Sequence, residues 1–422
     1  MYETFTHKES IERIAMQAEE KIRKSHVEID KMIEKNQLRV LDVFQRHQVS
    51  DFHFTPSTGY GYDDVGRDTL EQIYADVFGG EAALVRPQII SGTHAIATAL
   101  FGILRPGDEL MYITGAPYDT LEEVVGVRGK NNGSLKEFGI SYNVIPLQED
   151  GSVDVHLVQQ SISKKTKVIG IQRSKGYASR PSFFIEEIEK MIQAVKAVKE
   201  DVIVFVDNCY GEFVESKEPC HVGADIIAGS LIKNPGGGIV KTGGYLVGRK
   251  DLIDLASYRL AAPGIGAEGG ASLYSLLEMY QGFFLAPHIV GQSLKGALFT
   301  AACLQLLGMK TSPSWEEMRT DLIQAVEFSS AESMVAFCQA IQKASPINSH
   351  VIPTPSPMPG YEDPVIMAAG TFIQGASIEL TADGPLRPPY RAYVQGGLTY
   401  AHVKIAVLKA VDRLIDEGFI EL

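Results

Sequence analysis

The sequence has no apolar run long enough for a membrane-spanning helix, which requires about 20 such residues. It also shows no secretory signal, because the first residues, MYETFTHKESIERIAMQAEEKI, are charged from the third position and lack an apolar stretch. These absences predict a soluble, cytoplasmic protein.

Cysteine is scarce, with four residues in 422: Cys209, Cys220, Cys303 and Cys338. Their spacing matches neither a disulfide framework nor the paired cysteines of a zinc site, so no metal site is predicted. Lysine and arginine number 39 against 52 acidic residues, for a net charge of −13, and the basic residues are scattered. This pattern argues against nucleic acid as the main partner and leaves small-molecule chemistry as the default.

The chain does contain a regular alternation of apolar runs and helical stretches. Its 422 residues exceed the roughly 250–300 at which a single core stops growing, so more than one domain is expected. The change in residue pattern along the chain predicts three parts. These are an N-terminal helical arm over 1–58, a large α/β domain over 59–288 and a small C-terminal α+β domain over 289–422.

Seven apolar runs are expected to form the strands of the large domain: ALVRPQII, ELMYIT, SYNVIPL, KVIGIQ, DVIVFVD, ADIIAGS and GGYLVG. Because helical stretches separate most of them, they predict a mostly parallel seven-stranded sheet with helices on both faces. In the small domain we expect long helices over 290–307 and 315–344 and a closing helix over 402–417. Short strands are expected there at 365–369, 377–380 and 391–395.

Ligands of parallel sheets bind beyond the carboxyl ends of the strands, and the first two runs carry suitable groups there. Ser91, Gly92 and Thr93 form a small-residue turn before a helix, which would attract a phosphate group through its N–H groups and dipole. A simple helix cap explains the same residues. Tyr118 follows the second run, where it could stack on a flat heterocycle or be an ordinary exposed tyrosine.

Two further strand ends carry charged residues. Asp207 closes the fifth run, where a buried carboxylate needs a cation or donor; a turn or cap residue is the alternative. Lys233 follows the sixth run on glycine-rich backbone, three residues after Ser230. Burial there is expected to lower its pKa and favour attack on an aldehyde, although a solvent-exposed lysine is the commoner case. Together, an anion turn, a stacking ring, an aspartate and an amine are what pyridoxal phosphate requires.

Three segments carry a resemblance to a known family: GGEAALVRPQIISGTHAIATALFGILRPGDEL, VDNCYGEF and GSLIKNPGGGIVKTGGYLVG. They resemble the fold-type-I pyridoxal-phosphate enzymes of the Cys/Met metabolism group, and most closely the methionine γ-lyase-like or aluminium-resistance proteins. The resemblance implies pyridoxal 5'-phosphate as cofactor, held covalently by Lys233, with Asp207 on the pyridine nitrogen and Tyr118 on the ring. It places these residues at the phosphate: Ser91, Gly92, Thr93 and Ser230.

The resemblance also implies residues for the substrate and for a second subunit. Arg391, or Arg387 four residues earlier, would bind the substrate α-carboxylate. Tyr60, Tyr62 and Arg67 would reach the phosphate site of a neighbouring subunit. A homodimer or homotetramer with shared active sites is therefore expected.

The activity implied by the resemblance is a carbon–sulfur lyase that releases a thiol from a sulfur-containing amino acid by γ-elimination, with a 2-oxo acid and ammonia as products. Tyr118 or a tyrosine of the neighbouring subunit is the candidate acid for the leaving thiolate. Two alternatives stay open: a transferase (aminotransferase or γ-replacement enzyme), and a non-catalytic stress protein on the same fold. Asp119 and Thr120 follow Tyr118, whereas methionine γ-lyases have a cysteine shortly after the stacking tyrosine. The identity of the leaving group therefore stays open. The second lysine of the glycine-rich loop, Lys241, is expected to be structural or solvent-facing.

Overall fold

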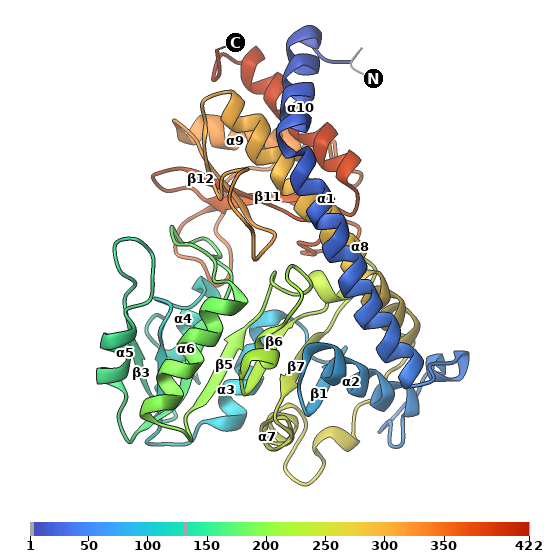
Figure 1. Cartoon of the computed structure of the whole chain (residues 1–422), viewed down its shortest axis with the longest axis vertical. Helices are drawn as coiled ribbons and strands as arrows, with labels where there is room; N and C mark the ends of the chain where they lie inside the picture. The colour runs from blue at the N-terminus through green and yellow to red at the C-terminus, as the bar shows by residue number, and fades with distance from the viewer. Residues whose placement is uncertain (1–3, 130–132, 422) are drawn as a thin grey trace. The chain divides into compact units, whose positions relative to one another are not determined.

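The computed structural model describes residues 4–129 and 133–421, which pack into two compact units (Figure 1). The large unit is Asn36–Phe284, and the small unit combines Met1–Lys35 with Leu285–Leu422. Two long helices, α1 (Lys8–Arg46) and α8 (Leu276–Leu306), each supply residues to both units.

The large unit is built on a seven-stranded sheet with the strand order β1-β7-β6-β5-β4-β2-β3. The neighbouring pairs from β6 to β3 are parallel, and β7 runs antiparallel to both β1 and β6. The prediction of a mostly parallel seven-stranded sheet is therefore confirmed, and each of the seven apolar runs overlaps one strand. The strands are β1 (Ala82–Arg86), β2 (Glu109–Tyr112), β3 (Ser141–Val144), β4 (Thr166–Gln172), β5 (Ile203–Asp207), β6 (Ile226–Ser230) and β7 (Gly244–Gly248).

Helices connect the strands of the large unit and cover the sheet. On one face, alternate strand residues such as Leu84, Phe205 and Leu246 form one apolar cluster with residues of α3, α4 and α7. The α-helices are α2 (Val65–Phe78), α3 (Gly92–Ile103), α4 (Asp119–Val125), α5 (Val155–Ser161), α6 (Ile185–Val198) and α7 (Lys250–Leu260). Short 3-10 helices are η1 (Asp51–Phe54), η2 (Pro219–Val222), η3 (Asn234–Gly236) and η4 (Gly266–Glu268).

The small unit holds an antiparallel five-stranded sheet with the order β10-β11-β12-β9-β8. Its core joins this sheet to α9, α10 and the first turns of α1. The strands are β8 (Lys310–Ser312), β9 (Gln324–Glu327), β10 (Val365–Ala368), β11 (Thr381–Pro385) and β12 (Arg391–Gln395). The helices are α9 (Ala331–Lys343) and α10 (Tyr400–Asp416).

Two expectations for the small unit are wrong. The predicted helix over 315–344 contains the strand β9, and α9 begins only at Ala331 because Ser330 caps it by accepting a hydrogen bond from Ser333 N at 3.2 Å. The predicted strand over 377–380 lies before β11, which pairs with both β10 and β12 and so takes an interior place in the sheet. In both cases pairing with distant strands decided the local structure.

The N-terminal segment forms part of both units and not a separate arm. Ile11, Ile14 and Ile22 of α1 are buried in the core of the small unit. Val40 and Val43 of the same helix are also buried, but they belong to the large unit. The chain therefore divides after residues 35 and 284, in place of the expected limits at 58 and 288. Within the described residues, none of the helices combines the length and apolar character that a bilayer span requires.

Candidate cofactor site

A cavity of about 190 Å³ lies in the large unit, where β4, β5 and β6 end. Residues that follow five strands of the sheet line it, as expected for a parallel sheet. Seven of the predicted site residues lie on its wall: Ser91, Gly92, Thr93, Tyr118, Asp207, Ser230 and Lys233. The structure thus brings together residues that are separated by up to 142 positions in the chain (233 − 91).

The first turn of α3 forms one side of the cavity. Ser91 is the N-cap, and its Oγ accepts a hydrogen bond from His94 N at 3.0 Å, so this hydroxyl orders the turn. A Cβ on Gly92 would lie 3.2 Å from Cys209 Sγ and 3.5 Å from Ser230 Cβ, so the glycine lets these residues approach. The turn presents helix N-terminal N–H groups beside the Ser230 hydroxyl, which suits an anion such as phosphate.

Asp207 is the last residue of β5 and is buried. Burial raises its pKa, while the charge of Lys233 and a hydrogen bond from Cys209 N at 3.1 Å act in the opposite direction. A carboxylate in this position gains most from a cationic N–H donor, such as a protonated ring nitrogen.

Lys233 is half-buried in the cavity wall at the start of η3, and its Nζ lies 4.1 Å from the centroid of the Tyr210 ring. Burial alone lowers the pKa of Lys233. The acidic groups of Cys209, Tyr210, Asp207 and Glu212 nevertheless raise it above its ordinary value. The expectation of a lowered pKa for Lys233 is therefore wrong for the protein without a cofactor. It rested on burial alone and left out the acidic groups at the end of β5 and in the loop that follows.

Tyr118 is half-buried and packs on the loop after β4. A Cβ on Gly176 would lie 2.7 Å from Tyr118 Cδ2, so a glycine at this position leaves room for the ring. The ring of Tyr177 lies 5.7 Å from that of Tyr118, centroid to centroid. Tyr118 therefore contributes an aromatic ring to the cavity wall, as stacking requires.

The sequence reasoning missed nine residues of the cavity wall, and three of them are Gln172, Cys209 and Tyr210. Gln172 ends β4 in register with Asp207 on β5, so the strand-end rule would have found it. Its Oε1 is buried without a hydrogen-bond partner in the described part of the chain, and it offers an acceptor to a bound molecule. Tyr210 adopts a left-handed backbone conformation (φ +71°), which no feature of its sequence signals.

Tyr60, Tyr62 and Arg67 lie outside this cavity. The two tyrosines are exposed, by 78% and 53%, and their rings stack with centroids 5.4 Å apart. Arg67 is buried and donates hydrogen bonds to the carbonyl groups of Gly61 (2.5 Å) and Gly270 (3.0 Å), so it fixes the loop that presents them. Their role in a neighbouring subunit stays a prediction.

The two candidate arginines for the substrate belong to the small unit. Arg391 opens β12 and pairs with Glu327 at 3.1 Å, and Arg387 pairs with Asp363 at 2.8 Å. Their role at the substrate stays a prediction. Lys241, by contrast, is 76% exposed and pairs with Glu278 at 2.8 Å, so its expected solvent-facing position is confirmed.

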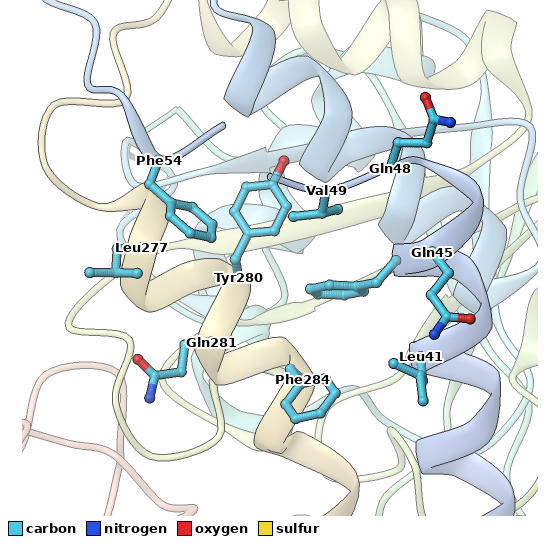
Figure 2. Close-up of a pocket in the computed structure, with 10 residues that line it drawn as sticks. Leu41, Gln45, Gln48, Val49, Phe54, Leu277, Tyr280, Gln281 and Phe284 are labelled. Atoms are coloured by element: carbon cyan, nitrogen blue, oxygen red, sulfur yellow. The ribbon is translucent and has the colours of Figure 1, made fainter. Parts of the chain in front are cut away.

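A second cavity of the large unit is larger, at about 460 Å³, but its lining differs in kind. Figure 2 shows Leu41 and Gln45 on one helix, Tyr280 and Phe284 on another, and amide groups at the margin. Among the described residues, no acid, lysine, arginine or histidine lines it, so it offers hydrophobic contact without the groups that catalysis needs.

The sheet and its strand-end cavity define a class of protein, the fold-type-I pyridoxal-phosphate enzymes. The chain belongs to the methionine gamma-lyase family, whose profile matches residues 11–415. The uncharacterized protein YnbB of Bacillus subtilis is 68% identical over 421 residues, which is 100% of both chains.

Solved structures resemble the chain over almost its whole length. A Listeria monocytogenes protein, named as a proposed cystathionine beta-lyase involved in aluminum resistance, is 65% identical with a TM-score of 0.94, covering 95% of this chain and 99% of its own. A carbon-sulfur lyase involved in aluminum resistance from Clostridium novyi is 48% identical with a TM-score of 0.93, and 96% of each chain is covered.

The family implies pyridoxal phosphate as cofactor, and the residues of the cavity fit this group. A helix N-terminus with the Ser230 hydroxyl suits the phosphate, the buried Asp207 suits the ring nitrogen, and Lys233 supplies an amine. The unpartnered Oε1 of Gln172 is a further acceptor for a polar substituent of the ring.

Proposed function

We propose that the protein is a pyridoxal-phosphate-dependent carbon–sulfur lyase that acts on a sulfur-containing amino acid by γ-elimination. Its products are a thiol, a 2-oxo acid and ammonia. The observation that carries the proposal is the meeting of Lys233, Asp207 and the first turn of α3 in one cavity. The names of the Listeria and Clostridium relatives support carbon–sulfur bond cleavage as the reaction class.

The predicted residues of the cavity have defined tasks in this proposal. The N–H groups at the start of α3, with the hydroxyls of Thr93 and Ser230, would hold the phosphate. Asp207 would accept a hydrogen bond from the protonated ring nitrogen, and Tyr118 would stack on the ring. Pyridoxal phosphate, when bound, supplies the electron sink for charge that develops at the substrate Cα.

Lys233 would have two tasks, since its amine would hold the cofactor and, when free, would act as a base. In the second task it would remove the proton from the substrate Cα. Lys233 must be uncharged for this step, although its acidic neighbours favour the charged form. Tyr118, on the same cavity wall, is the group that we assign to protonate the leaving thiolate.

Reduction with borohydride tests the attachment site. Protein loaded with pyridoxal phosphate should be yellow, and borohydride should bleach it and fix the cofactor on the peptide that contains Lys233. The exposed Lys241 of the same loop is the internal control. Cofactor fixed on Lys241, or protein that stays colourless with pyridoxal phosphate, contradicts the proposal.

A steady-state assay tests the reaction. Methionine, cystathionine and cysteine S-conjugates are supplied singly, and 2-oxo acid and ammonia are measured. Release of both products without an amino acceptor supports the lyase, with methionine reporting γ-elimination. A strict requirement for a second substrate indicates a transferase and contradicts the lyase.

A further inference from the structure

Two buried glutamates follow β5, and the structure accommodates them differently. Glu218 is fully buried and pairs with Arg173 at 3.5 Å and with Arg39 at 3.6 Å. Glu212 is equally buried, but within the described ranges no lysine or arginine forms an ion pair with it. A carboxyl group buried without a paired cation is costly, so its presence beside the cavity calls for a reason.

The surroundings of Glu212 hold its carboxyl group in place. Tyr245 Oη donates a hydrogen bond to Oε1 at 2.7 Å, and the Glu212 carbonyl accepts one from Nδ2 of Asn234, the residue after Lys233, at 2.9 Å. Gly229 on β6 makes room, because a Cβ there would lie 2.6 Å from Oε1. The second oxygen, Oε2, is buried and has no hydrogen-bond partner among residues 4–129 and 133–421.

These contacts tie Glu212 to the segment that carries Lys233. Gly229 lies on β6, which ends three residues before the lysine, and Asn234 is the residue directly after it. Glu212 therefore contacts the chain both before and after Lys233. We propose that Glu212 is a positioning residue that sets the charge state of the Lys233 amine. This inference rests on the proposed function, because that charge matters to catalysis only if Lys233 is the reacting amine.

The electrostatics of the two groups agree with this assignment. Burial raises the pKa of Glu212 to about 8, against the hydrogen bond from Tyr245 and the charge of Lys233. Glu212 is in turn one of the groups that raise the pKa of Lys233. Glu212 therefore changes its charge close to neutral pH, where a lyase would work, and the lysine responds to that change.

Other titratable groups face the same pair. Around Lys233 they are Cys209, Tyr210 and Asp207, and around Glu212 they are Glu218, Tyr245 and Tyr74. Burial raises the pKa of Cys209 above its ordinary value of 9.0, and those of Tyr74 and Tyr245 above 10.0, so these three are uncharged near neutral pH. Glu212, with a pKa of about 8, changes its charge within the range between about 7 and 9.

Trace acetylation of the full-length, cofactor-free protein with acetic anhydride tests the inference. The rate at Lys233, measured by peptide mass spectrometry and divided by the rate at Lys241, reports the free-amine fraction. Below about pH 7, where Glu212 is neutral, wild type and Glu212→Gln should react equally. Above about pH 8 the wild-type rate should fall about tenfold behind the variant, since a neighbouring charge shifts a pKa by a unit or more.

Two tyrosine variants complete the design. Tyr245→Phe removes the donor to Glu212, which stays neutral to higher pH, so this variant should also exceed the wild-type rate above about pH 8. It tests the inference even if Glu212→Gln does not fold. Tyr280→Phe also loses a buried hydroxyl, but outside the site, and its profile should match wild type.

The outcomes separate this inference from the proposed function. Coincident wild-type and Glu212→Gln profiles at every pH, with native circular dichroism, overturn the inference. A rate change of equal size at all pH values overturns it as well, because that result indicates a purely structural role. Failure of pyridoxal phosphate to attach at Lys233 would instead overturn the proposed function, and the acetylation profile would remain measurable.

Discussion

Two cavities of the large unit differ in volume and in lining, and the smaller one carries the chemistry. The cavity of about 460 Å³ is bordered by apolar and amide side chains of α1 and α8 (Figure 2). The cavity of about 190 Å³ contains Asp207, Lys233 and the first turn of α3. Size measures only the room for apolar contact, whereas catalysis needs ionisable groups whose charge the surroundings control.

The difference follows from how each cavity is built. Parallel strands end at the same edge of a sheet, so the residues after β4, β5 and β6 must meet. The helices α1 and α8 have no such common end. The space beside them is lined by the side chains on the faces that the two helices turn toward it, and these are mostly apolar. Substitutions should therefore affect activity at the strand ends and stability beside the helices.

The largest effect should come from Lys233→Ala. Without the amine, the variant has no covalent anchor and no base at the substrate Cα, so kcat should fall by at least about 10³-fold. The assay is release of 2-oxo acid from the best substrate, and cofactor absorbance after dialysis measures retention. Lys241→Ala is the matched control, and a variant that keeps wild-type kcat after losing Lys233 contradicts the proposed site.

Asp207→Asn should have the next largest effect. The amide preserves the shape but cannot hold a proton on the ring nitrogen, and kcat should fall by about 10²-fold or more. Because burial raises the pKa of Asp207, its charged form is costly in the cofactor-free protein. The melting temperature of the cofactor-free variant should therefore be no lower than that of wild type. A large fall in melting temperature with unchanged kcat would instead make Asp207 a structural residue.

The sequence predicted the seven strands and the residues that end them because both depend on local patterns. Apolar runs locate the strands, and the strand-end rule then selects Asp207 and Lys233. The sequence alone could not predict β9 or β11, because their pairing with distant strands overrides local preference. Nor could the sequence predict the position of Glu212, which depends on its hydrogen bond from Asn234 Nδ2 and on the space that Gly229 leaves for its carboxyl group.

The third prediction concerns the pH dependence of stability at Glu212. Its pKa is about 8 in the folded protein against an ordinary 4.5, so its contribution to stability is fully present below pH 4.5 and is lost as the pH rises to about 8. Glu212→Gln has no such proton to lose. Relative to wild type, the variant should gain on the order of 4 kcal/mol between these pH values.

Chemical denaturation of wild type and variant at about pH 5 and about pH 8 measures this difference. The informative quantity is the change in the gap between the two proteins, since other groups titrate equally in both. A gap that stays constant, or one that favours wild type at the higher pH, contradicts a buried glutamate with a raised pKa.

The smallest effect is expected beside the apolar cavity, from Tyr280→Phe. Tyr280 Oη donates to the Gly66 carbonyl at 2.7 Å, and its loss should lower the free energy of unfolding by about 1 kcal/mol. kcat and KM should stay at wild-type values, because no group of the strand-end cavity is touched. Tyr245→Phe is the counterpart, since its hydroxyl also lies buried but bonds to Glu212. If Tyr280→Phe changes kcat as much as Tyr245→Phe does, the two cavities are coupled and the contrast between them fails.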